Sequence, residues 1–135
     1  MFIERVSTEL KRAERYRIFV SLIILDVSFL QTLFPNHGSS LRSELAELVG
    51  KHIRSIDDIS ILGSGKLGLL FPETTRQGAE IASRRITELI HGRLSEMNAG
   101  QVEHVIPLEM ASYPDAAGAM SITDFLRDYS QESLN

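Results

Sequence analysis

The sequence predicts an α/β domain of the α+β type, with a mixed sheet, a split βαβ core, helices on both faces and a central β-hairpin. Two kinds of segment alternate along the chain: some place apolar residues at helical spacing, and others are short continuous apolar runs. Two of the apolar runs are separated by GSGK alone, as in a hairpin. The length of 135 residues suits one domain with a substantial core, so we expect residues 1–135 to form a single domain.

The first half of the chain predicts one buried strand among three helices. The segment IFVSLIIL is rich in β-branched and aliphatic residues, which is typical of a strand covered on both faces. The helices are indicated by apolar residues on one face and by charged residues on the other. The expected elements are helices over residues 2–16, over residues 29–34 and after a capping Ser39 or Ser40, and a strand over residues 18–25 that ends at Asp26.

The second half predicts a hairpin, a long helix, a further strand and a final helix. The further strand contains Pro107, which lacks an N–H donor and therefore places the strand at an edge of the sheet or gives it a bulge. The expected elements are strands over residues 58–62, 67–71 and 102–112, and helices over residues 73–94 and 121–131.

The tetrapeptide GSGK resembles the core of a phosphate-binding loop, but the residues around it do not fit that motif. The loop requires G-x-x-x-x-G-K-[ST] between a strand and a helix. Ser60 stands where the first glycine belongs, Leu67 stands where the hydroxyl belongs, and a strand pattern follows. The sequence instead favours a hairpin turn at residues 63–66, where glycine adopts positive φ at little cost.

Composition excludes several classes of function. The net charge is −4 and no basic stripe is present, so we expect no nucleic-acid partner. The longest apolar run is too short to span a bilayer, which predicts no direct membrane insertion and a cytoplasmic setting. The chain has no cysteine, and His37, His52, His91 and His104 fall on separate elements. We therefore expect neither a metal site nor a cofactor.

Four segments together resemble the GGDEF family of diguanylate cyclase domains. LGSGKLGLLFP lies where the family has LGGDEFAVLLP, and SLIILDVSFL is similar to its LLLLDIDHFK. ELAELV and MASYPDA are similar to its LAELL and ASYPED segments. The order and spacing of these segments cover nearly the whole chain, although the family's final ALYxAK helix has no counterpart. The resemblance implies the family fold, with residues 1–16 as the helix that connects to an upstream module.

The resemblance also implies that the chemistry of the family is lost. Two GTP molecules are joined there with help from a metal site, which uses an aspartate at the end of the first strand and an acidic residue in the hairpin. Asp26 matches the first position, but Gly65 and Lys66 supply no carboxylate. Leu33 replaces the asparagine that reads guanine, and Leu30 replaces a lysine. We therefore expect a degenerate, catalytically inactive domain in which Asp26 is vestigial.

A second ligand site of the family is matched more closely. That site binds the product cyclic di-GMP through an RxxD motif placed five residues before the hairpin, often with an arginine from the following helix. Arg54 and Asp57 have this spacing from Gly63, and Arg85 falls at the helix position. An arginine fork suits phosphate or the guanine edge, and an aspartate can accept the N1 and N2 donors of guanine. We expect all three side chains, and Lys66, to be exposed.

The residues leave alternatives open. Arg54 could instead complement a helix C-terminus while Asp57 ends a loop, Arg85 could be an ordinary surface arginine, and Lys66 either contacts a phosphate or is solvated in its turn. Three functions follow: a cyclic di-GMP receptor, a ligand-free scaffold, and, least favoured, a residual cyclase. The expected partners are cyclic di-GMP and either another protein or a second copy of the chain, within a larger bacterial signalling protein.

Overall fold

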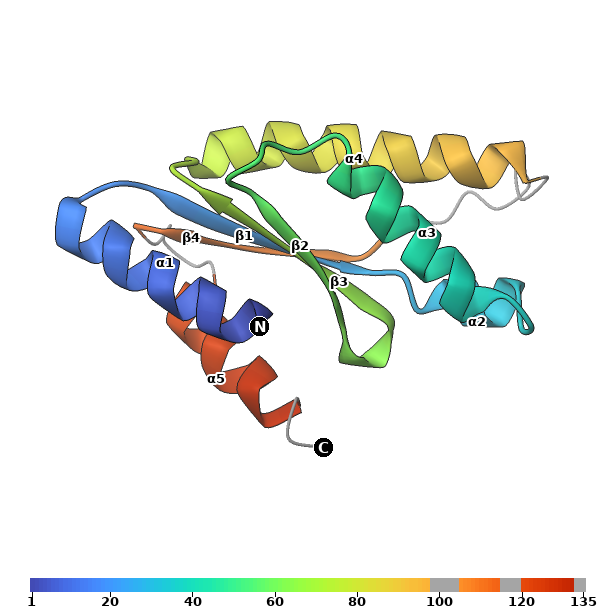
Figure 1. Ribbon diagram of the computed structural model, residues 1–135, viewed down its shortest axis with the longest axis horizontal. Helices are drawn as coiled ribbons and strands as arrows, with labels where there is room; N and C mark the ends of the chain where they lie inside the picture. Colours follow the sequence, from blue (N-terminus) through green and yellow to red (C-terminus); the bar gives the residue numbers. More distant parts are fainter. Residues whose placement is uncertain (98–104, 115–119, 133–135) are drawn as a thin grey trace.

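The computed structural model describes residues 1–97, 105–114 and 120–132, which form a four-stranded sheet with helices on both faces (Figure 1). The strands lie in the order β2-β3-β1-β4. The elements are α1 (Phe2–Tyr16), β1 (Val20–Asp26), α2 (Phe29–Leu33), α3 (Gly38–Gly50), β2 (Asp58–Leu62), a 3-10 turn (Gly63–Gly65), β3 (Lys66–Pro72), α4 (Arg76–Glu96), β4 (Leu108–Tyr113) and α5 (Ile122–Glu132).

The sheet is antiparallel at every neighbouring pair, whereas the sequence predicted a mixed sheet. The strands β1 and β2, joined through α2 and α3, run in the same direction but have β3 between them. Likewise β3 and β4 are joined through α4 and have β1 between them. The predicted split βαβ core is therefore confirmed, in two copies. Because each helical connection passes over one strand, parallel strands never become neighbours.

Side chains of β1 alternate between two hydrophobic cores, one on each face of the sheet. Ile23 and Leu25 pack in the core beneath α3 and α4. Leu22 and Ile24 pack in the core beneath α1 and α5. Burial on both faces explains why this strand is a continuous apolar run rather than an alternating one. The predicted helices on both faces are confirmed, and Figure 1 shows α4 and α3 on one side with α1 and α5 on the other.

The helix α1 is held against the sheet by an aromatic contact at its first residue. The Phe2 ring lies over Gly68 of β3, where an added Cβ would approach the ring to 2.8 Å and the Leu62 side chain to 2.9 Å. The Phe125 ring of α5 meets Phe2 edge to face at 6.5 Å between centroids, and it lies 4.5 Å from the Tyr129 ring. The absence of a side chain at Gly68 thus lets the two terminal helices pack together on one face.

Several predicted boundaries differ from the structure: α4 begins at Arg76 and not at residue 73, and β1 begins at Val20 and not at residue 18. The strand β4 begins at Leu108, after Pro107, whose carbonyl accepts a hydrogen bond from the Asp26 amide (2.9 Å). It is an edge strand, the first of the two predicted alternatives, although Pro107 precedes it and does not lie within it. The expected strand residues 102–104, including His104, lie outside the described residues. Neither predicted serine caps α3: its N-cap is His37, and Ser40 donates its hydroxyl to the His37 carbonyl (3.1 Å).

Candidate functional site

The hairpin turn at residues 63–65 is closed against the end of β1. Gly65 has a positive φ of 73°, and its carbonyl accepts a hydrogen bond from the Val27 amide (2.9 Å). A Cβ at Gly65 would lie 2.9 Å from the Ser28 Cα, so the turn has no room for a side chain there. Gly63 is different: its φ is not positive, and a Cβ there would meet nothing within 4 Å. The expected positive φ is therefore confined to Gly65 within this turn.

Asp26 and Lys66 lie opposite each other where β1 and β3 meet this turn. The Asp26 carboxylate accepts a hydrogen bond from the Ser28 amide (2.9 Å). The Lys66 ammonium donates to the Tyr129 hydroxyl (3.1 Å) and lies 5.2 Å from the centre of that ring. Lys66 is thus half-buried against α5, not solvated in the turn as one interpretation held. Across residues 1–97, 105–114 and 120–132, no group of three histidines or carboxylates could hold a metal ion.

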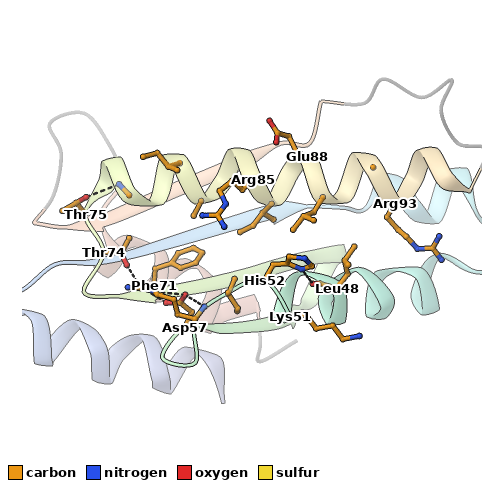
Figure 2. A pocket seen from close by; sticks show the side chains of 18 of the residues that line it. Leu48, Lys51, His52, Asp57, Phe71, Thr74, Thr75, Arg85, Glu88 and Arg93 are labelled. Atoms are coloured by element: carbon orange, nitrogen blue, oxygen red, sulfur yellow. Dashed lines mark hydrogen bonds and ion pairs between the residues drawn. The ribbon is translucent and has the colours of Figure 1, made fainter.

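A groove of about 1170 Å³ lies on the other face of the sheet, between α4 and the segment that joins α3 to β2 (Figure 2). Arg54, Asp57 and Arg85, the three residues predicted from the RxxD resemblance, all line it. The long helix α4 begins at the N-cap Thr75, whose hydroxyl accepts from the Gly78 amide (3.1 Å), and this start fixes the register that places Arg85 over the groove. Residues from two distant segments of the chain are thereby brought to one site.

Arg54 and Asp57 form a tight pair within the groove. The Asp57 carboxylate accepts from the Arg54 amide (2.8 Å), Nε (3.2 Å) and Nη2 (2.9 Å). The same Nη2 donates to the Pro72 carbonyl (2.9 Å) and to the Thr74 hydroxyl (2.6 Å). The Arg54 side chain stays 52% exposed, but that of Asp57 is only 3% exposed. The expectation that Asp57 is exposed is therefore wrong, because its oxygens accept hydrogen bonds from Arg54, which begins the same turn three residues earlier.

The cations of the groove differ in how far they are already engaged. Arg85 is exposed, and Figure 2 shows its side chain directed from α4 toward the groove while Glu88 is directed away. Arg93 is bound by Glu44 and Glu96. Its hydrogen bond to Glu44, with the charge of that carboxylate, raises the pKa of the Arg93 guanidinium above its ordinary value. Arg85 is therefore better placed than Arg93 to meet an anion, while Arg54 keeps half of its side chain exposed although Asp57 already holds it.

The remaining lining gives the groove an apolar floor. The residues that we call the floor are Leu48, Phe71, Ile86 and Leu89, which line the groove with apolar side chains. An apolar floor with a few fixed polar groups is typical of small-molecule sites, and here it suits a ligand with flat rings and negative charge. Sequence reasoning missed Thr74 and His52 as lining residues. Proximity to Pro72 and to the helix start was a signal for Thr74, but its contact with Arg54 depends on the fold.

Comparisons with known proteins connect this fold to one family of structures. No family model matches the chain, and no curated protein matches it by sequence. The diguanylate cyclase SiaD of Pseudomonas aeruginosa, solved with its activator SiaC, superposes with a TM-score of 0.70 at 19% identity; the match covers 99% of this chain and 52% of that one, so the chain spans about half of SiaD.

Two further solved structures match the chain over most of both lengths. The active GGEEF domain of a diguanylate cyclase from Vibrio cholerae has a TM-score of 0.63 at 20% identity, covering 92% of this chain and 80% of that one. The GGDEF domain of DgcB from Caulobacter crescentus, in complex with cyclic di-GMP, has a TM-score of 0.66 at 13% identity, covering 96% and 78%. The chain thus has the fold of GGDEF diguanylate cyclase domains, as the resemblance implied.

Within the described ranges, no helix combines the length and the apolar character needed to cross a bilayer.

Proposed function

We propose that the chain is a catalytically inactive signalling domain that binds cyclic di-GMP in the groove at Arg54, Asp57 and Arg85. The observation that carries this proposal is the meeting of the three residues in one groove, with Arg54 held in place and still half exposed. Two arginines beside an apolar floor provide charge for the phosphates and surface for the bases. The DgcB domain of similar fold was solved with cyclic di-GMP, which makes this ligand the first to test.

The proposed loss of catalysis rests on the hairpin turn. A metal site for phosphoryl transfer needs carboxylate ligands. Asp26 could supply one, but the turn residues 63–66 contain no acidic residue. The close approach of Gly65 to Ser28 leaves no space for a carboxylate at position 65, and the Lys66 ammonium is engaged with Tyr129. Without preorganised charge at this place, phosphoryl transfer slows by orders of magnitude.

We expect purified protein to form no cyclic di-GMP from GTP in the presence of Mg²⁺ or Mn²⁺. Product can be followed by chromatography, with the active Vibrio cholerae GGEEF domain as the positive control. Asp26→Ala serves as the matched variant of this chain. Product that is formed by the wild type and disappears in Asp26→Ala would contradict the proposal and favour a residual cyclase.

Calorimetry with cyclic di-GMP tests the groove directly. A hydrogen bond from a charged group contributes about 1.5–3 kcal/mol, so Arg54→Ala is expected to weaken binding at least roughly tenfold. Arg85→Ala should weaken it less, because its guanidinium is not held by neighbouring groups to the same degree. Lys66→Ala is the control, since Lys66 contacts α5 on the other face of the sheet. Equal affinity of wild type and Arg54→Ala would place the dinucleotide elsewhere.

A scaffold that binds another protein, or a second copy of the chain, is the second candidate function. Tyr16 and Phe19 favour it, because these aromatic side chains are 60% and 48% exposed close to each other in the sequence. SiaD, of similar fold, was solved with a protein activator. If neither cyclic di-GMP nor GTP produces heat on titration, this candidate replaces the receptor, and light scattering then decides between monomer and dimer.

A further inference from the structure

We infer that Asp57 and Thr74 are positioning residues: they hold the Arg54 guanidinium so that one edge faces the groove, and Asp57 does not itself contact the bound ligand. This inference rests on the proposed function of the groove as a cyclic di-GMP site. It assigns Thr74 a role that the sequence did not suggest, and it gives Asp57 a role different from acceptance of guanine donors.

The donors of Arg54 are divided between the protein and the groove. A guanidinium has five N–H groups in a fixed fork. Those of Nε and Nη2 are used by Asp57, Pro72 and Thr74. In the part of the chain that the structure describes, the two N–H groups of Nη1 make no hydrogen bond to protein. They can meet a phosphate oxygen without disturbing any existing contact.

Asp57 is placed to orient Arg54 and not to meet a ligand. Its side chain is 3% exposed. One carboxylate oxygen accepts from the Arg54 amide and Nε, and the other accepts from Nη2. To reach a guanine edge, this carboxylate would have to leave Arg54 and carry its charge out of a nearly buried position. That movement would also release the guanidinium that the ligand needs.

Thr74 completes the restraint and connects it to the interior of the sheet. Its hydroxyl donates to the Pro72 carbonyl (2.9 Å) and accepts from Arg54 Nη2 (2.6 Å). The carbonyl of Thr74 accepts from the Ser21 hydroxyl (2.8 Å), which in turn shares a hydrogen bond with Ser112 (3.0 Å). Both serines are buried. Arg54 is therefore fixed relative to β1 and β4, which lowers the entropy cost of binding an anion.

The ligand property that this arrangement recognises is a phosphodiester. Arg54 offers Nη1, and Arg85 extends from α4 toward the same groove. Neither contact depends on which base the dinucleotide carries. Loss of Asp57 is then expected to weaken binding of related cyclic dinucleotides by the same factor, because it releases Arg54 without removing a base contact.

Calorimetry on the full chain with cyclic di-GMP and cyclic di-IMP separates these roles. The inosine ligand lacks only the 2-amino donors that an aspartate would accept. We expect Thr74→Val to weaken both ligands about fivefold, as for one lost hydrogen bond, and Thr74→Ser to restore wild-type affinity. Asp57→Asn should weaken both by about tenfold and leave their affinity ratio unchanged. In the free protein, the Arg54 Nε–H signal in NMR should be sharp in wild type and Thr74→Ser and broadened in Thr74→Val.

Each other result overturns a defined part. If Asp57→Asn changes the ratio of the two affinities, Asp57 contacts guanine and the inference is wrong. If Thr74→Val binds with wild-type affinity, Thr74 does not position Arg54. If Asp57→Asn does not fold, the comparison of Thr74→Val with Thr74→Ser tests the inference by itself. If the wild type binds neither ligand, both the proposed function and this inference are wrong. If the wild type binds but Asp57→Asn changes the ratio of the two affinities, only the inference is wrong.

Discussion

Phe125→Ala is expected to lower the free energy of unfolding by about 3–5 kcal/mol, which corresponds to a drop of roughly 10–20 °C in the thermal midpoint. The Phe125 side chain is fully buried between α1, α5 and the sheet. Its removal leaves a cavity and also deletes the edge-to-face contact with Phe2 and the contact with Tyr129. The cost is high because three elements lose a common partner.

Urea titration measures this change, and Phe19→Ala is its matched control. Phe19 is 48% exposed, so its truncation should shift the free energy of unfolding by no more than about 0.5 kcal/mol. The two variants remove the same atoms, one set from a fully buried position and the other from a position about half exposed. Equal unfolding midpoints for both would show that α5 does not belong to the core that covers this face.

Gly65→Asp is expected to cost about 2–4 kcal/mol and to restore no cyclase activity, alone or with Lys66→Glu. A residue with a Cβ at a φ of 73° carries a penalty of about 1–2 kcal/mol, and overpacking against Ser28 adds to it. The new carboxylate could be accommodated only by opening the turn. By the sequence resemblance, Leu33 also still stands where the family has the asparagine that reads guanine.

Gly63→Asp provides the control in the same turn. A Cβ at Gly63 meets no atom within 4 Å and its φ is not positive, so we expect a change within about 0.5 kcal/mol. Thermal unfolding of the two variants, with an assay for product from GTP, makes the comparison. Gly65→Asp as stable as Gly63→Asp would mean that the turn is open in solution, and turnover by the double variant would refute the proposed reason for inactivity.

Strong local patterns in the sequence predicted the elements well. The helix over residues 2–16 was predicted with the bounds that α1 has, and the hairpin was placed at β2 and β3. In both cases the hydrophobic period and the turn residues act within the segment itself, so no distant contact is needed to specify them. The split βαβ core followed from the order of elements alone.

Features that depend on distant contacts were predicted less well. The pairing of β1 with β3 and β4 is set by how the connections pass over the sheet, so the antiparallel arrangement could not be derived from the strands alone. The burial of Asp57 could not be derived from composition, because it results from the Arg54 guanidinium, which covers the Asp57 carboxylate across the turn. Thr74 reaches Arg54 only after β3 has been paired beside the segment that precedes β2.

The terminal helices and the groove lie on opposite faces of the sheet, so attachment of a neighbouring domain and binding of a ligand use different surfaces. The terminal helices α1 and α5 share one face (Figure 1). The groove lies beside α4 on the other face. A neighbour attached through either terminal helix would sit behind the sheet and would not compete for space with a molecule in the groove. Binding of a molecule in the groove could then affect that neighbour only by changing the twist or the stiffness of the strands that both faces share. A tag fused at either end should accordingly leave affinity for the groove ligand unchanged.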